Sequence, residues 1–265
     1  MSSIIRPTPR QRTRRLIVLA AALFAIIVPL VQNLSGLGLT QSEFAADGNS
    51  TLRVAGYAFS IWGLIYIGIL AYAIRQALPQ TGESPLLGRM GLPSAVAFFG
   101  IGFWIIVAAL NLKAASVGVI FASLIALLLP MLAVSSPIRA LRMFDRERIL
   151  LVWPLAALSG WLTVAAPLNL ITTATAFNAL PAALSPDLWA IVAIVAVTVI
   201  ALAVTAVLRT LAYPLPTAWG FLGAFVSEQA DKPTVAFTAL AGAIVLLIGG
   251  LLLTFRLRPG VERAR

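Results

Sequence analysis

Long runs of apolar residues dominate the chain and are separated by short polar stretches. Runs long enough to cross about 30 Å of hydrocarbon as a helix lie at residues 16–34, 54–76, 92–112, 115–135, 149–170, 188–208 and 234–256. A further run, 211–228, is shorter and is interrupted by Pro214 and Pro216. The pattern predicts an all-α fold, a polytopic integral membrane bundle of about eight transmembrane helices.

The cationic residues between the runs predict the orientation of the bundle. If all the runs cross and the N-terminus is cytoplasmic, every one of the 19 Lys and Arg residues except Arg53, Lys113 and Lys232 lies on the cytoplasmic side. This asymmetry follows the positive-inside rule, and omitting the short run would put the Arg-rich C-terminus on the opposite side. We therefore expect cytoplasmic N- and C-termini and a location in a bacterial inner (cell) membrane.

Two connecting segments refine this picture. The basic N-terminus resembles that of a signal peptide, but its apolar run is long enough to span and no small-x-small cleavage site closes it, so a retained first helix is expected. The segment "NALPAALSPD", 178–187, has the composition of a linker. It divides the chain into a five-helix unit, 1–180, and a three-helix C-terminal membrane extension, 181–265. The Arg-rich loop 135–153 is expected to contact anionic lipid headgroups.

The composition excludes several classes of function. The chain is 60% hydrophobic and 11% charged, with a mean hydropathy of +0.99, which is typical of membrane proteins. The net charge of +10 lies between apolar runs and not on a polar surface, so no nucleic acid partner is predicted. Cys and His are absent, which removes disulfides, thiolate chemistry and the usual zinc sites. We predict no catalytic residues, no metal ligands, no cofactor and no enzymatic activity.

Aromatic residues are concentrated in the stretch "GYAFSIWGLIYIG", 56–68. Phe59, Trp62 and Tyr66 are spaced by three and four residues and share one face of a helix, with Tyr57 at the membrane entrance. An interfacial position suits Tyr57. Tyr66 lies about 13 Å deeper by the helical rise, so Trp62 and Tyr66 either pack against neighbouring helices or line a ligand cavity.

Two carboxamides, Asn111 and Asn169, lie near the ends of the third and fifth predicted spans. A buried amide requires a hydrogen-bond partner, so each either joins helices or binds a ligand. Trp104 lies two turns before Asn111, and Trp161 lies eight residues before Asn169, so each pair is predicted to share a face. Two faces that combine an aromatic ring with an amide are therefore expected to converge.

These residues carry a resemblance to a known family. "YAFSIWGLIYIGILAYAI", 57–74, resembles the second-helix signature of the tryptophan-rich sensory protein family (TspO/MBR, relatives of the translocator protein or peripheral benzodiazepine receptor). The interval from Trp62 to Tyr66 matches, and "WLTVAAPLN" reproduces the family's Trp and Asn eight residues apart at Trp161 and Asn169. The resemblance covers residues 10–180. The family's Pro-Pro before the second helix and its Asn-x-x-Trp in the third helix are missing here.

The resemblance implies a five-helix bundle around a pocket for tetrapyrroles, sterols or aromatic drugs. We predict a membrane protein that binds or senses a flat hydrophobic ligand such as a porphyrin, with Arg53 as a candidate partner for its propionates. A secondary transporter or permease of a small hydrophobic molecule is the alternative, although no charged residue lies deep in a predicted span. Membrane lipids are predicted partners, and a homodimer remains a hypothesis. The predicted ligand-binding residues are Tyr57, Phe59, Trp62, Tyr66, Trp104, Asn111, Trp161 and Asn169.

Overall fold

The structure, a computed structural model, describes residues 8–78 and 84–255. All elements in these ranges are helical. In chain order they are α1 (Pro9–Ser35), α2 (Gln41–Ala46), the 3₁₀ helix η1 (Gly56–Ser60), α3 (Ile61–Ala77), α4 (Pro85–Ala109), α5 (Lys113–Ala133), α6 (Ser135–Ala140), the π-helical turn η2 (Arg148–Val152), α7 (Trp153–Ala176), α8 (Pro186–Leu208), α9 (Pro214–Glu228) and α10 (Pro233–Phe255).

Three of the long helices begin at the same local signal, a hydroxyl residue followed by proline. The side chain of Thr8 accepts a hydrogen bond from the Gln11 amide at 3.3 Å. Ser84 and Ser185 cap α4 and α8 in the same way. The hydroxyl satisfies one of the free amides of the first turn, while the proline at the next position has no amide to satisfy. The sequence therefore fixes where these helices start.

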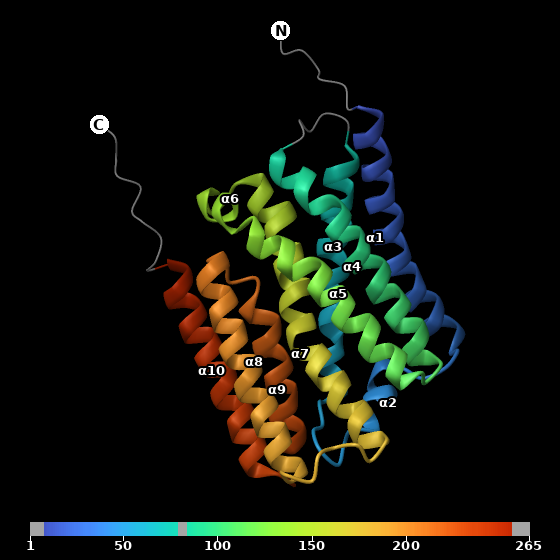
Figure 1. The fold of residues 1–265 in the computed structure, drawn as a ribbon, viewed down its shortest axis with the longest axis vertical. Helices are drawn as coiled ribbons and strands as arrows, with labels where there is room; N and C mark the ends of the chain where they lie inside the picture. The colour runs from blue at the N-terminus through green and yellow to red at the C-terminus, as the bar shows by residue number, and fades with distance from the viewer. Residues whose placement is uncertain (1–7, 79–83, 256–265) are drawn as a thin grey trace.

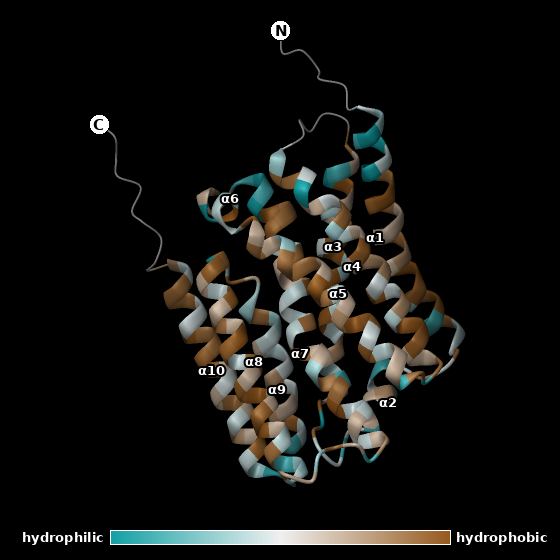
Figure 2. Ribbon diagram, viewed as in Figure 1, coloured by the Kyte–Doolittle hydropathy of each residue, from teal (hydrophilic) through white to brown (hydrophobic). Residues whose placement is uncertain are grey.

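The long helices run alternately up and down, so that the start of α1 and the end of α10 lie at the same end of the bundle (Figure 1). Within the described residues, seven segments are long and apolar enough to cross a membrane: α1, η1 with α3, α4, α5, η2 with α7, α8 and α10. Apolar residues cover their lengths and polar residues gather at the two ends (Figure 2). The prediction of a polytopic helical membrane bundle is confirmed.

α9 is the predicted short run, and with 15 residues it is shorter than the seven spans. It nevertheless extends from the level of the start of α7 to the level of α2. Leu215, in its first turn, lies in one groove with Trp153 at the start of α7, whereas Glu228, at its end, bonds to Arg53 beside α2. Because α9 reverses the direction between α8 and α10, both described chain ends lie on one side, as the distribution of charge predicts.

Two of the differences between the predicted boundaries and the structure affect the candidate site. The predicted second span, 54–76, begins as the 3₁₀ helix η1, and regular α-helix starts only at Ile61. The predicted third span reaches residue 112, whereas α4 ends at Ala109 and Asn111 lies in the following turn with a left-handed φ of 56°. Hydropathy cannot detect either change, because the residues stay mostly apolar across it.

α7 is the central helix. In its most apolar window 67% of the residues are buried, against 50% or less in the other spans. It lies between the group formed by α1, α3, α4 and α5 and the group formed by α8, α9 and α10 (Figure 1). Both groups depend on α7 for their packing, so the core is continuous across the predicted division at residue 180.

α9 packs directly on the first unit. A Cβ on Gly160 of α7 would overlap the carbonyl oxygen of Tyr213, so the two backbones touch there. Thr217 donates to the Gly160 carbonyl at 2.8 Å, and the Trp219 indole N–H donates to the Ala58 carbonyl at 2.9 Å. The C-terminal helices are therefore tied to α7 and η1 by close packing and hydrogen bonds.

Candidate functional site

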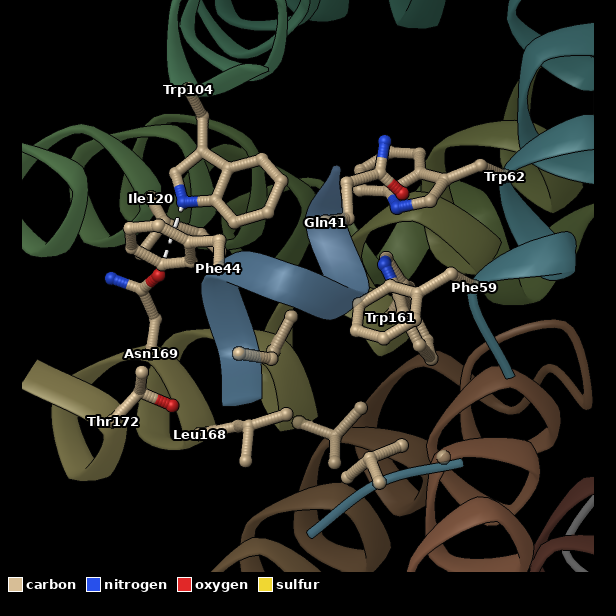
Figure 3. Close-up of a pocket in the computed structure, with 15 residues that line it drawn as sticks. Gln41, Phe44, Phe59, Trp62, Trp104, Ile120, Trp161, Leu168, Asn169 and Thr172 are labelled. Carbon is tan, nitrogen blue, oxygen red and sulfur yellow. Dashed lines mark hydrogen bonds between the residues drawn. The ribbon is translucent and has the colours of Figure 1, made fainter. Parts of the chain in front are cut away.

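A pocket lies inside the bundle, next to α2, where residues from seven elements converge (Figure 3). α7 contributes the largest share, and α2, η1, α3, α4, α5 and α9 contribute the rest. The lining residues are Gln41, Phe44, Ala45, Val54, Phe59, Trp62, Trp104, Ile120, Trp161, Val164, Ala165, Leu168, Asn169, Thr172 and Gly220.

Aromatic rings form one end of the pocket. The ring of Trp161 meets Trp62 edge to face at a centroid distance of 6.1 Å and meets Phe59 in the same manner at 6.3 Å. Tyr66 stacks on the far side of this group, 5.4 Å from Trp62. Edge-to-face and offset contacts are the favourable arrangements for aromatic pairs, so the three rings that line the pocket form a fixed wall.

An amide and an indole form the other end. The Trp104 indole N–H donates to Asn169 Oδ1 at 3.2 Å, and Asn169 Nδ2 donates to Ser116 Oγ at 2.9 Å. Asn169 thus joins α4, α5 and α7. The side chain therefore connects helices, one of the two alternatives for this amide, and it also lines the pocket. Ligand binding by Asn169 stays a prediction.

Three polar atoms of the pocket wall are buried without a hydrogen-bond partner in the described part of the chain. They are Trp62 Nε1, Trp161 Nε1 and Thr172 Oγ1. A buried donor left unsatisfied costs about 1–3 kcal/mol. A polar ligand group that accepts a hydrogen bond from such an atom recovers this free energy. Figure 3 shows Trp62 and Trp161 at the end near the Gln41 carboxamide, and Thr172 at the end near Asn169.

The pocket is small in this conformation. Its free volume is about 30 Å³, enough for water, whereas pockets for drug-sized ligands measure roughly 300–1,000 Å³. α2 closes one side, since Gln41, Phe44 and Ala45 project into the pocket from this short helix. A larger ligand therefore needs more space than the pocket has in this conformation.

Polar contacts stabilise α2 at its start and attach its end to α5. At its start Glu43 accepts hydrogen bonds from the Thr40 amide at 2.7 Å and the Thr40 hydroxyl at 2.8 Å, and these bonds lower the pKa of the Glu43 carboxyl. At its end Asp47 pairs with the buried Lys113 at 2.5 Å, and the Lys113 ammonium also lies 4.5 Å from the centre of the Phe44 ring.

The structure brings five of the eight predicted site residues together at the pocket: Phe59, Trp62, Trp104, Trp161 and Asn169. Tyr66 lies behind Trp62. Tyr57 is 45% exposed and contacts α9, where its ring meets Trp219 and its hydroxyl donates to the Leu222 carbonyl.

Asn111 and Arg53 lie away from the pocket. The prediction that Asn111 shares a face with Trp104 is wrong, because α4 ends before it and its side chain is exposed in the turn. Arg53 is adjacent to the pocket residue Val54, but its guanidinium bonds to Glu228 and Asp231. Through these bonds Arg53 connects the loop after α2 to the end of α9.

Gln41, Phe44, Thr172 and Gly220 also line the pocket but were not among the predicted site residues. The pair Thr40 and Glu43, a hydroxyl residue followed three positions later by Glu, is a capping box. That signal was sufficient to predict a short helix here and to place Gln41 and Phe44 on it. Gly220 gave no signal, because its position depends on how α9 packs on α7.

The fold and the pocket define a class: a polytopic helical membrane protein with an aromatic cavity closed by a short helix. Comparison with known families places the chain more closely. Residues 15–252 match the family described as TSPO-like protein, and the chain belongs to this family. The match includes α8, α9 and most of α10, so the C-terminal helices fall within it. No curated protein and no solved structure matches the chain.

Proposed function

We propose that this membrane protein binds a flat, mainly apolar small molecule in the aromatic pocket between α2 and α7, and does so without covalent chemistry. The observation that carries the proposal is the set of unsatisfied donors, Trp62 Nε1, Trp161 Nε1 and Thr172 Oγ1, which lines a cavity whose other surfaces are aromatic and aliphatic. Such a wall suits a planar ring system with a few polar atoms.

The donors indicate where the polar atoms of the ligand lie. An indole N–H only donates, so a ligand carbonyl, carboxylate or ring nitrogen is expected opposite Trp62 and Trp161. A tetrapyrrole carries such groups on a planar ring, and a sterol has one hydroxyl on a flat body; both remain candidates. Since the chain has no His, a metal-free porphyrin held by ring stacking and hydrogen bonds is the form we propose to test first.

Binding requires displacement of α2. A porphyrin is far larger than the present cavity of about 30 Å³, so Gln41, Phe44 and Ala45 must leave the pocket as it enters. α2 has only six residues, and isolated helices shorter than about 12 residues are marginal in water. Its position therefore depends on its contacts with the bundle, among them the buried Phe44 ring, which meets Trp104 edge to face at 6.0 Å.

The test is a titration of the purified full-length protein in detergent with protoporphyrin, followed by the Soret absorbance of the ligand. Trp161→Phe keeps a ring and removes the N–H, and Thr172→Val keeps the volume and removes the hydroxyl. Each is expected to weaken binding about three- to tenfold, the value of one hydrogen bond. Trp189→Phe is the matched control, because Trp189 donates to the Pro181 carbonyl outside the pocket. Equal affinity in all four proteins would remove the pocket assignment.

A further inference from the structure

A second cavity lies at the opposite end of the bundle from α2, near α6 and the end of α10. Its volume is about 240 Å³, and Arg148, Trp153, Thr210 and Thr254 are among its lining residues. It is formed by the start of α7, the segment between α8 and α9, and the last turn of α10. None of these residues belongs to the aromatic pocket.

The polar groups of this cavity are donors. Arg148 is 1% exposed and donates to two carbonyl oxygens, those of Ile138 at 2.8 Å and Arg209 at 3.4 Å. The hydroxyls of Thr210 and Thr254, each 1% exposed, have no hydrogen-bond partner among the described residues. The guanidinium charge and the two free hydroxyls together favour an anion with several acceptor oxygens.

Other threonines of the C-terminal helices show that the state of Thr254 is unusual for this fold. Thr198 and Thr205 donate to carbonyls four residues earlier, at 2.8 and 2.7 Å. This bond is the ordinary way for a helical threonine to satisfy its hydroxyl. Thr254 does not make it, and instead its side chain lines the cavity with Arg148.

An apolar groove continues from the cavity. The groove has a volume of about 310 Å³ and shares Trp153, Ala212 and Leu215 with the cavity. From there it follows α3 past Leu64 and Ile67, which are 69% and 68% exposed. Both residues belong to a segment long and apolar enough to cross the membrane, so the groove lies where acyl chains surround the protein.

We propose that one anionic phospholipid of the bilayer occupies the cavity and the groove together. The headgroup phosphate binds beside Arg148, Thr210 and Thr254, and one acyl chain lies along Leu64 and Leu215. The predicted orientation makes this end cytoplasmic, and the cytoplasmic leaflet is rich in anionic lipid. The turn that carries Arg148 is π-helical, a distortion that is frequent at functional sites.

The test compares lipids on the delipidated full-length protein in detergent, with native mass spectrometry to count bound lipid and thermal unfolding to measure stabilisation. The probes are dioleoylphosphatidylglycerol, dioleoylphosphatidylcholine and soluble glycerol phosphate. One phosphatidylglycerol is expected to bind at least tenfold more tightly than phosphatidylcholine. Glycerol phosphate, which has no chain for the groove, is expected not to compete at equal concentration.

Substitutions in the cavity and in the groove test where the lipid binds. The double substitution Thr210→Val and Thr254→Val keeps the side-chain volumes and is expected to weaken binding of phosphatidylglycerol about tenfold, while the unfolding temperature without lipid stays unchanged. Ala157→Leu fills the groove and is expected to weaken binding of both lipids. Thr238→Val is the control on α10, since that hydroxyl bonds to the Thr234 carbonyl and lies outside the cavity.

Each contrary result overturns a defined part of the proposal. Equal binding of the two lipids would show that the site does not select an anionic headgroup. Competition by glycerol phosphate would show that the site binds a free phosphate and not a lipid. An unchanged affinity for phosphatidylglycerol in the double Thr variant would show that the lipid does not bind in this cavity. These outcomes do not depend on the aromatic pocket, so they leave the proposed function unaffected.

Discussion

Trp104 and Asn169, 65 positions apart in the sequence, form the hydrogen bond that joins α4 to α7 at the wall of the pocket. The bond fixes the amide so that its other end reaches Ser116 of α5. It also explains why only two of the three tryptophans that line the pocket have an unsatisfied N–H: Trp104 donates to the protein, whereas Trp62 and Trp161 have no described acceptor.

Asn169→Ala is therefore expected to destabilise the protein even without ligand. The change leaves the buried Trp104 N–H without its acceptor, and we expect a loss of about 2 kcal/mol in the free energy of unfolding. Thermal or denaturant unfolding in detergent measures it. Asn111→Gly is the control, because the exposed Asn111 has a left-handed φ of 56° that glycine adopts freely. An equal loss in both variants would contradict the structural role of Asn169.

Trp161→Phe, in contrast, is expected to leave the stability of the protein nearly unchanged. The N–H that it removes has no partner in the described structure, so the free energy of unfolding should change by less than about 1 kcal/mol, with the loss of ring contacts offset by removal of an unsatisfied donor. Ligand affinity should fall as described above. A variant that loses stability and affinity in parallel would show that the indole is needed for packing.

The stability of the capping box that begins α2 is expected to depend on pH. The folded pKa of Glu43 lies below its usual value because Thr40 donates two hydrogen bonds to the carboxylate. The stabilisation is thus present above the unfolded pKa of about 4.3 and is lost as the pH falls through the folded value. A spin label on Ala46→Cys, an exposed position in a chain with no native cysteine, should become more mobile below about pH 4.

Glu43→Gln provides the matched comparison for this experiment. Glutamine keeps the side-chain oxygen of the capping box and does not titrate. The label in this variant should show the same mobility above and below pH 4. A pH response that persists in Glu43→Gln would assign the effect to a different group.

Gly160→Ala is expected to separate α9 from α7. The added Cβ overlaps the Tyr213 carbonyl, so the backbones must move apart and the bond from Thr217 to Gly160 is lost; we expect a cost of at least about 3 kcal/mol. Gly118→Ala on α5 is the control, because nothing lies within 4 Å of the new Cβ, and it should be neutral or stabilising by about 0.5–1 kcal/mol. Similar unfolding temperatures for the two variants would contradict the close contact.

The positions of the helices follow closely from the sequence. Each of the eight predicted runs corresponds to a helix of the bundle, because the hydrocarbon core imposes a minimum length and forces the backbone to satisfy its own hydrogen bonds. The predicted partition of charge also agrees with the topology. Arg53, Lys113 and Lys232, the three cations predicted on the far side, lie near α2 and pair with Asp231, Asp47 and Asp187.

The candidate site could be predicted from the sequence only in part. The spacing of Phe59, Trp62 and Tyr66 indicated a ring cluster. Only the packed structure shows that Phe59 and Trp62 line the pocket and that Tyr66 stacks on Trp62 outside the lining. Likewise Asn111 and Asn169 look equivalent in the sequence, and only the end of α4 separates their roles.

The sequence by itself determined the number of helical runs, their alternation and the ends at which charges lie, because each depends on local hydropathy and on the thickness of a bilayer. Only the tertiary structure decided which polar atoms remain unsatisfied. Whether a buried hydroxyl or indole N–H finds an acceptor depends on residues that lie far away in the chain and within about 3 Å in space. That difference separates Trp104 from Trp161, and it marks both the aromatic pocket and the cavity at Arg148.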